Sequence, residues 1–194
     1  MIRLMLIGRK GSGKDTIAEI IRKKRPEVQR HAFADALKRD AKDLLKIAKD
    51  RFGVHGAPNF DMGDGDGWRA LMRPFWQWYG TDFVRTYDPD HWIRRFDYSY
   101  GHLSNVVVTD CRFANEAQYG KQNGFVLVRV MGPDRRGNEP AETVNHLSEI
   151  AMDDYACDMT IDNTGTLEQL EDDVLLRLLP FVESRSFLRP SNVW

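Results

Sequence analysis

A glycine-rich loop near the start of the chain carries residue types that bind phosphate. It runs from Gly8 to Lys14, reads GRKGSGK and fits the pattern GxxxxGK. Glycines let the backbone curve so that its N–H groups point at phosphate oxygens, and the lysine adds a point charge. An ordinary glycine turn would explain this composition, but an apolar run precedes the loop and an amphipathic run follows it. The loop is therefore predicted to hold phosphates, with Lys14 on the β- and γ-phosphates.

Asp15 stands where loops of this pattern usually carry Ser or Thr. A hydroxyl there would ligate Mg²⁺, and a carboxylate is also a hard oxygen ligand. Two interpretations stay open: Asp15 ligates or orients Mg²⁺, directly or through water, or it only stabilises the N-terminus of the following helix. Thr16 supplies a hydroxyl one position later and is expected to contact a phosphate.

A second acidic position, Asp110, ends the apolar run NVVVTD. In open α/β sheets, ligands bind outside the carboxyl ends of the strands, so Asp110 is predicted to hold Mg²⁺ through water. Arg112 follows two residues later, within reach of a phosphate, and Glu116 lies one turn into the next helix. The alternative for Arg112 and Glu116 is an ion pair on a solvated helix start.

Two helical clusters predict a second anionic substrate opposite the loop. Asp35 and Lys38 open the helix after the second strand, where a carboxylate can accept a proton or a hydrogen bond from an acceptor group. The alternative for Asp35 is an ordinary helix N-terminal carboxylate. Arg73, Gln77 and Arg85 lie on two adjacent helical segments. Arginine suits a phosphate monoester, and glutamine suits the edge of a base. Aromatic rings suit the face of a base, but most of those nearby are expected in the core: Trp76, Trp78, Tyr79 and Phe83.

A third cluster, Arg135 and Arg136, lies in the loop MGPDRRGNEPAETV after a strand-like run. Guanidinium groups on such a loop would neutralise charge that develops in the transition state and help to exclude water. The pair is therefore predicted to belong to a small lid. A solvated basic turn is the alternative.

Regularly alternating strand and helix patterns must position these residues. Strand-like runs are expected at 2–7, 28–33, 105–110, 125–130 and 158–162. Helical runs are expected at 14–24, 34–52, 68–79, 82–96, 115–123 and 166–179, with a break around Gly80. Continuous apolar strands that alternate with helices predict an α/β fold: a parallel sheet of about five strands with helices on both faces.

One domain suits 194 residues of which 42% are hydrophobic. We expect a core at 1–52 and 103–181, an acceptor-binding helical insertion at about 53–102, a lid at about 131–145 and a C-terminal tail at 182–194. The tail is a candidate for docking on a second copy, so a homodimer stays open.

Charge and cysteine content exclude several classes of protein. The formal net charge is −1, from 28 basic and 29 acidic residues, which argues against bulk nucleic-acid binding. Cys111 and Cys157 are too few for a disulfide framework, which fits a reducing cytosol. No stretch approaches the roughly 20 apolar residues that span a bilayer. We therefore expect a soluble, cytoplasmic protein that acts on small molecules.

Taken together, the motifs resemble the phage-type deoxynucleoside monophosphate kinases, within the broader P-loop nucleoside and nucleotide kinases. An aspartate directly after the loop lysine is a mark of this group, which accounts for Asp15. The resemblance covers roughly residues 2–180. Its matching segments are GRKGSGKDT, FADALK, WQWYGTDFVRTYDPDHW, VVVTDCRFANEA, HLSE and MTIDNTGTLEQLEDDV.

The resemblance implies a three-layer P-loop NTPase fold and transfer of the ATP γ-phosphate, with Mg²⁺, to a deoxynucleoside 5′-monophosphate. The product would be a diphosphate for DNA synthesis, made in the cytoplasm of a phage-infected bacterium. The implied ATP contacts are Arg9, Lys10, Gly11, Ser12, Gly13, Lys14, Asp15, Thr16 and Asn163. The implied acceptor contacts are Asp35, Lys38, Arg73, Gln77, Arg85, Arg112 and Glu116. The implied catalytic residues are Lys14, Asp35, Asp110, Arg112, Arg135 and Arg136, and the implied metal ligands are Asp15 and Asp110.

Other functions fit part of the same pattern. The animal-type phosphomevalonate kinases share the GKD stretch, the DxR segment and a late NxG turn, but their acceptor has no base. A P-loop ATPase or switch module would work through protein partners and would need no acceptor pocket. A kinase that acts on bases within DNA would need a local basic patch. The aromatic residues and Gln77 favour a free nucleotide as the acceptor.

Overall fold

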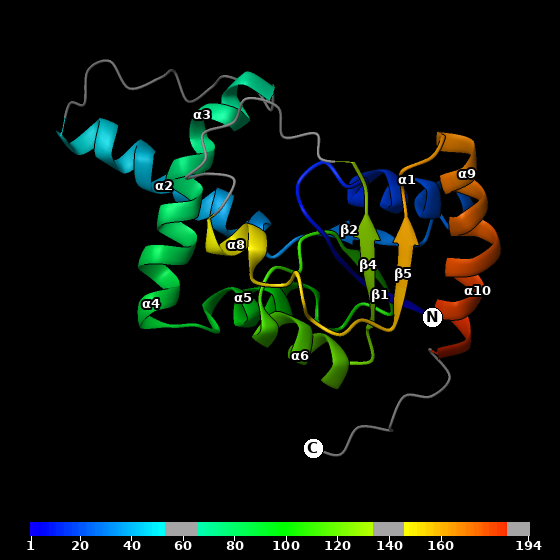
Figure 1. Ribbon diagram of the computed structural model, residues 1–194. Coiled ribbons are helices and arrows are strands. Elements are labelled where there is room, and N and C mark those ends of the chain that lie inside the picture. The colour runs from blue at the N-terminus through cyan, green and yellow to red at the C-terminus, as the bar shows by residue number, and fades with distance from the viewer. Residues whose placement is uncertain (53–65, 134–145, 186–194) are drawn as a thin grey trace.

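The computed structural model describes residues 1–52, 66–133 and 146–185, and its centre is one sheet of five parallel strands (Figure 1). The strand order is β2-β3-β1-β4-β5. Parallel pairing along the whole sheet confirms the α/β fold that the sequence predicts. The strands are β1 (Ile2–Ile7), β2 (Gln29–His31), β3 (Asn105–Val108), β4 (Val126–Met131) and β5 (Met159–Asp162).

The central strand β1 is buried on both faces. All six of its residues are buried, and it pairs with β3 in the register Met5↔Val108 and with β4 in the register Leu6↔Val128. Leu4 and Leu6 belong to one hydrophobic cluster, whereas Met5 and Ile7 belong to the other. This alternation of sides explains why a doubly covered parallel strand reads as a continuous apolar run.

One face of the sheet packs against helix α1 (Lys14–Lys24) and the C-terminal helical segment. That segment comprises α9 (Leu167–Asp172), the π-helical η2 (Asp173–Leu178) and α10 (Leu179–Arg185). Buried α1 residues such as Ile17 and Ile21 recur at helical spacing, which is the amphipathic pattern of a covering helix. The C-terminal segment continues beyond the expected end at residue 179.

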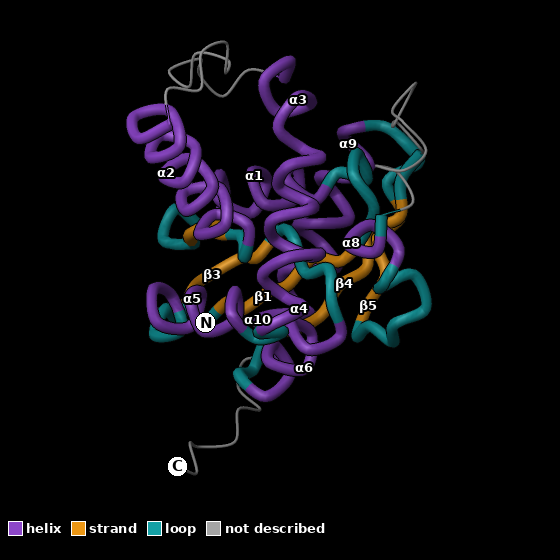
Figure 2. Tube along the Cα trace, turned by 90° about the vertical axis from the view of Figure 1, so that its left-hand side faces the viewer, coloured by secondary structure: helices purple, strands orange, loops and turns teal. Residues whose placement is uncertain are grey.

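The other face packs against α5 (His91–Tyr100), α6 (Ala114–Gln122) and the first turn of α2 (Ala34–Phe52). Here Phe33 and Phe96 contact each other with ring centroids 4.8 Å apart. The two covered faces make the three layers that the sequence predicts. In the quarter-turn view the strands run between helices on either side (Figure 2).

The expected break around Gly80 is wrong. Helix α3 (Asp66–Gln77) continues through the π-helical η1 (Trp78–Val84) into α4 (Arg85–Tyr87). The helix ends just before Pro89, since proline disfavours a helical residue before it. Gly80 instead permits close packing, because a Cβ there would lie 1.9 Å from Leu37 Cδ1.

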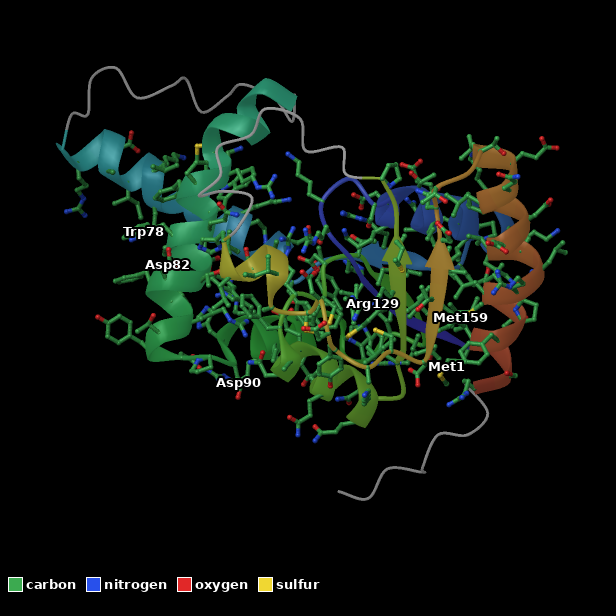
Figure 3. The ribbon with its side chains drawn as sticks, in the orientation of Figure 1. Met1, Trp78, Asp82, Asp90, Arg129 and Met159 are labelled. Carbon is green, nitrogen blue, oxygen red and sulfur yellow. The ribbon has the colours of Figure 1, made fainter. Side chains whose placement is uncertain are left out.

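Figure 3 places Trp78 and Asp82 on this helical rod, to one side of Arg129 and Met159 on the strands. The first part of the predicted insertion, most of the predicted lid with Arg135 and Arg136, and the end of the tail lie outside the described residues. A four-residue helix that the sequence did not predict, α8 (Leu147–Ile150), follows the second gap. No helix in the described ranges is long and apolar enough to cross a membrane.

Candidate functional site

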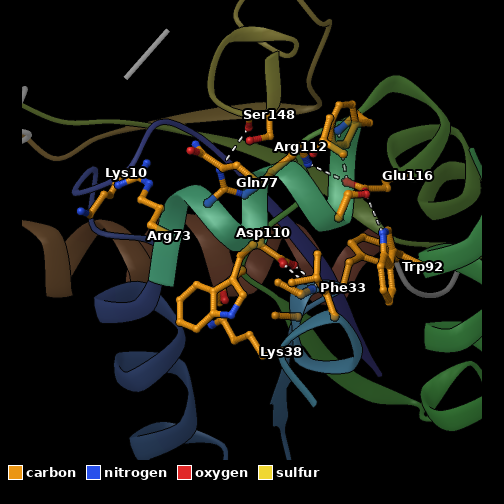
Figure 4. A pocket seen from close by; sticks show the side chains of 18 of the residues that line it. Lys10, Phe33, Lys38, Arg73, Gln77, Trp92, Asp110, Arg112, Glu116 and Ser148 are labelled. Carbon is orange, nitrogen blue, oxygen red and sulfur yellow. Dashed lines mark hydrogen bonds between the residues drawn. The ribbon is translucent and has the colours of Figure 1, made fainter. Parts of the chain in front are cut away.

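A cavity of about 560 Å³ opens at the carboxyl edge of the sheet, where the loops after β1, β2 and β3 meet the α3–η1–α4 rod (Figure 4). In parallel α/β sheets this edge collects ligand-binding loops. Lys10 and Arg73 lie on one side of it, and Glu116 and Trp92 lie on the other. Eleven predicted residues line the cavity: Lys10, Gly11, Lys14, Asp15, Lys38, Arg73, Gln77, Arg85, Asp110, Arg112 and Glu116.

Basic side chains dominate the lining. Seven basic residues face three acidic ones, which leaves a formal excess of four positive charges in a protein of net charge −1. A low-dielectric cleft lined by one sign of charge attracts ligands of the opposite sign. The cavity therefore suits a highly anionic guest. Its basic residues are Lys10, Lys14, Arg30, Lys38, Arg73, Arg85 and Arg112.

The residues that directly follow β4 and β5 pack against the glycine loop. Gly13 has φ 101°, and a Cβ there would lie 2.2 Å from the Asn163 side-chain nitrogen. That nitrogen donates to the Ser12 carbonyl at 2.9 Å. A Cβ on Gly132 would lie 2.8 Å from the same carbonyl oxygen. The structure thus shows Asn163 in contact with the glycine loop, and its implied contact with ATP stays a prediction.

The Lys14 ammonium is held over the loop. It donates to the carbonyl oxygens of Gly8 and Arg9, each at 2.7 Å. Lys14 also lines the cavity, whereas Arg9 pairs with Asp153 after α8 and does not. Lys14 and Arg9 were both expected to contact phosphate. The structure brings Lys14 to the cavity, whereas Arg9 pairs with the Asp153 carboxylate. The other expected donor contacts outside the lining are Ser12, Gly13, Thr16 and Asn163.

Asp15 reaches the cavity, but as the partner of an arginine. Its Oδ1 accepts a hydrogen bond from Arg30 on β2 at 2.9 Å, and its side chain is 72% exposed. Asp15 lies in the first turn of α1, so its charge also faces the N-terminus of that helix. Arg30 was not singled out in the sequence, because strand β2 is short and its residues gave no phosphate-binding motif.

Asp110 fastens the turn between β2 and α2. Its carboxylate accepts from the backbone N–H groups of Phe33 at 2.8 Å and Ala34 at 2.9 Å. Burial raises the pKa of Asp110, and the hydrogen bond from Ala34 opposes that rise. The carboxylate lines the cavity at the predicted strand end.

Mg²⁺ fits this edge only as an ion shared with a phosphate. Within the described ranges no group of three or more His, Cys, Asp or Glu residues could hold a metal. Mg²⁺ commonly keeps several waters and takes one or two carboxylates plus substrate phosphates. Asp110 offers such a carboxylate in the cavity, whereas Asp15 is turned to Arg30.

Asp35 is directed to the backbone of its own turn. Its Oδ2 accepts from the Ala32 N–H at 2.9 Å, and the residue is not among those that line the cavity. This geometry favours the helix-terminal interpretation over a direct contact with an acceptor. Lys38, one turn later on α2, does line the cavity, and its ammonium lies 5.3 Å from the Trp76 ring centroid.

Glu116 is the buried acid of the cavity wall. Its side chain accepts from Arg85 at 3.1 Å and from the backbone N–H groups of Arg112 at 2.7 Å and Phe113 at 3.1 Å. Burial raises the pKa of Glu116 to about 7, while the Arg85 charge opposes the rise. The predicted alternative of a solvated ion pair with Arg112 is wrong, because the pair is buried and the partner is Arg85.

Arg112 is fixed by the unexpected helix α8. Its guanidinium donates to the Ser148 carbonyl oxygen at 3.1 Å, and both residues line the cavity (Figure 4). Ser148 lies in the HLSE stretch, which the sequence offered as part of the resemblance but without a role. Its neighbour His146 caps α8 and lies 3.3 Å from Asp82 on η1. The segment after the second gap thus contacts the rod.

Most aromatic residues of the rod do not lie in the core, contrary to expectation. Trp78 is 49% exposed and Phe83 is 46% exposed, whereas Tyr79 packs against the core. Trp76 lines the cavity. Helical spacing alone could not separate these positions, since the rod packs against α2 and leaves its other sides to the cavity or to solvent.

The sequence profile of the deoxynucleotide monophosphate kinase family matches residues 64–174, more than half of the chain. A protein of Acanthamoeba polyphaga mimivirus, provisionally named deoxynucleotide monophosphate kinase, is 28% identical over 192 residues, which cover 90% of this chain and 95% of the relative. Among solved structures, shikimate kinase from Aquifex aeolicus is similar with a TM-score of 0.49 and 15% identity, over 94% of this chain and 99% of that one.

Proposed function

The chain belongs to the deoxynucleotide monophosphate kinase family and is a phosphotransferase, and we propose that it transfers the γ-phosphoryl group of ATP to a deoxynucleoside 5′-monophosphate. The products are the deoxynucleoside diphosphate and ADP. One observation carries the proposal: a single cavity joins Lys14 of the glycine loop to Arg73, Gln77 and Arg85 of the rod. A donor phosphate and an acceptor phosphate can therefore share one basic cleft.

The donor side consists of the glycine loop and the start of α1. Loop N–H groups and the positive end of the helix attract the triphosphate. Lys14 exchanges part of its contact with the Gly8 and Arg9 carbonyls for phosphate oxygens. Asn163 keeps the loop in shape through the Ser12 carbonyl.

The acceptor side consists of the rod and the first turns of α2. Arg73 and Arg85 supply guanidinium groups for the 5′-phosphate, and Gln77 supplies an amide for a base edge. Trp76 offers an aromatic face in the same wall. This wall favours a nucleotide over a baseless acceptor such as phosphomevalonate. In the proposed organisation 1–52 and 103–181 form the core, and 53–102 form the acceptor-binding insertion.

Positioning and charge neutralisation provide the catalysis. An acceptor phosphate oxygen is already anionic near neutral pH, so no strong base is required. Arg112 lines the same cavity, and in the proposed mechanism it neutralises charge on the transferring group. Asp110 would hold Mg²⁺ through water, and the ion would supply shielding of the donor phosphate charge. Asp35 orients the β2–α2 turn.

The proposal is tested by measuring ADP release from Mg·ATP with each of dAMP, dGMP, dCMP and dTMP, with the matching ribonucleotides, and without acceptor. We expect release that depends on at least one deoxynucleotide, with the diphosphate found by chromatography. Release that is equal with and without every acceptor would indicate an ATPase module and overturn the proposal. Phosphomevalonate in the same assay tests the baseless acceptor.

A further inference from the structure

Arg85 is held more tightly than a substrate-binding side chain on a helix surface would be. Its side chain is 10% exposed, and its guanidinium carbon lies 3.8 Å from the Phe113 ring centroid. Arg85 also lines the cavity. The ring covers one face of the group, and its N–H donors lie in the guanidinium plane, so hydrogen bonds to a ligand come from its edge.

Two consecutive residues at the start of α6 occupy part of that edge. Glu116 accepts from Nη1 at 3.1 Å, and Asn115 accepts from Nη2 at 2.6 Å. A guanidinium has five N–H donors, so two bonds leave donors for a ligand. Asn115 is neutral and takes its hydrogen bond without cancelling the arginine charge.

Asn115 is itself fixed by other partners. Its side-chain nitrogen donates to the Pro89 carbonyl oxygen at 3.0 Å and to Asp90 Oδ1 at 2.7 Å. Its oxygen also accepts from the Glu116 backbone N–H at 3.1 Å. The amide thus joins Arg85, the start of α6 and the corner that follows the rod.

We propose that Asn115 and Glu116 are positioning residues for the acceptor: they hold the Arg85 guanidinium in the cavity wall, ready for the acceptor phosphate. The inference rests on the proposed function and deepens it. An arginine that is fixed beforehand loses less conformational freedom when its ligand binds, so binding is tighter. Neither residue needs to touch the nucleotide for this effect.

The first test compares Asn115→Ala with wild type under steady-state conditions. The acceptor used is whichever of dAMP, dGMP, dCMP and dTMP gives the highest kcat/KM. We expect KM for the acceptor to rise about tenfold, with KM for ATP within about twofold of wild type. An unchanged acceptor KM, or an equal rise in both KM values, would overturn the inference.

Asn123→Ala is the matched control. It removes an amide from the other end of α6, where Asn123 donates to the Tyr119 carbonyl oxygen. We expect it to leave both KM values unchanged even where it lowers the thermal midpoint. If it raised the acceptor KM as much as Asn115→Ala does, general loosening of α6 would explain both effects and the inference would fail.

The decisive test is a double-mutant cycle with Arg85→Ala. If Asn115 acts through Arg85, removing Asn115 in the Arg85→Ala background leaves the acceptor KM unchanged. Full additivity of the two effects would overturn the inference. The same cycle applies to Glu116→Gln, which keeps one acceptor oxygen but removes the charge and one of the two oxygens that accept hydrogen bonds.

A further variant covers the case in which Asn115→Ala does not fold. Asp90→Ala removes the carboxylate that accepts from the Asn115 nitrogen, and it leaves the Asn115 oxygen that accepts from Arg85. We expect the acceptor KM to rise with KM for ATP within about twofold of wild type, and an unchanged acceptor KM in a folded protein counts against the inference. If wild type phosphorylates no deoxynucleotide, the proposed function itself fails, which is a different result.

Discussion

At the scale of single residues, Lys14 carries the largest expected effect on turnover. Its ammonium is the only charged side-chain group that the glycine-loop pattern itself supplies, and it is already directed over the loop. We predict that Lys14→Ala lowers kcat at saturating ATP by about 10²-fold or more, as losses of transition-state charge stabilisation do. Lys23→Ala, at an exposed position in the last turn of α1, is the matched control. Equal turnover of the two variants would contradict the role of Lys14.

The raised pKa of Glu116 leads to a separate prediction about how stability depends on pH. Its pKa in the folded protein is about 7, above the ordinary value of 4.5, so the folded state holds this proton more strongly than the unfolded state does. The proton on Glu116 therefore contributes fully to the free energy of unfolding below pH 4.5, and this contribution is lost as pH rises toward 7. We predict that the free energy of unfolding of wild type, relative to Glu116→Gln, falls by roughly 1–3 kcal/mol from pH 5 to 7.5.

Urea unfolding of the two proteins at a series of pH values measures this difference. Comparison with the variant removes the shared contribution of Asp110, whose pKa is also raised. A constant difference across the range would show that Glu116 ionises as a solvated carboxylate does.

The sequence located several of these residues but not their partners. Asp110 was placed at the strand end because an apolar run followed by an acid is a local pattern, and the cavity lies there. The link between Arg85 and Asn115 spans 30 positions in the chain, and no local pattern reports a contact of that range. Asp35 looked like a candidate for the acceptor because spacing does not show which way a carboxylate turns.

At the scale of elements, Gly80 lets the rod pack closely against α2. A Cβ on Gly80 would lie 1.9 Å from Leu37 Cδ1, so Gly80→Ala must separate η1 from α2 or force Leu37 into another rotamer. Overpacking usually costs about 1–3 kcal/mol and the better helix propensity of alanine offsets up to about 1 kcal/mol, so we predict a net loss of about 0–2 kcal/mol of unfolding free energy. Denaturant unfolding of the single variants and of Gly80→Ala with Leu37→Ala measures it. The double variant is expected to lose less than the sum, and plain additivity would contradict the contact.

Helices and strands were predictable where burial constrains the residue types along their whole length. Strand β1 and helix α1 agree with the expected ranges, since burial imposes a continuous run on the first and a helical period on the second. The rod was misjudged because glycine often ends a helix, and only tertiary packing against α2 reveals its other use. Helix α8 has four residues, too few to establish a period.

At the scale of the whole molecule, charge is segregated rather than balanced. The net charge is −1, yet the cavity lining has an excess of four basic groups, so the attraction is local. This distribution suits small polyanions that bind in one cleft. It offers few favourable contacts to a long polyanion such as a nucleic acid. The acidic residues elsewhere would repel an extended nucleic-acid strand.

The same segregation predicts how one molecule that joins both substrates should bind. A compound in which adenosine and a deoxynucleoside are linked 5′ to 5′ through five phosphates would occupy the donor and acceptor sides together. A ligand at a hundred times its Kd adds about 2.7 kcal/mol to stability, so the gain should appear as a rise in thermal midpoint. Adenosine tetraphosphate with Mg²⁺ is the matched control, since it has a similar charge but no acceptor nucleoside. We predict that the linked compound stabilises the protein more than this control does, and that added salt reduces both gains. Equal stabilisation would mean that the rod offers nothing to a second nucleoside, and the cavity would then serve only the phosphates.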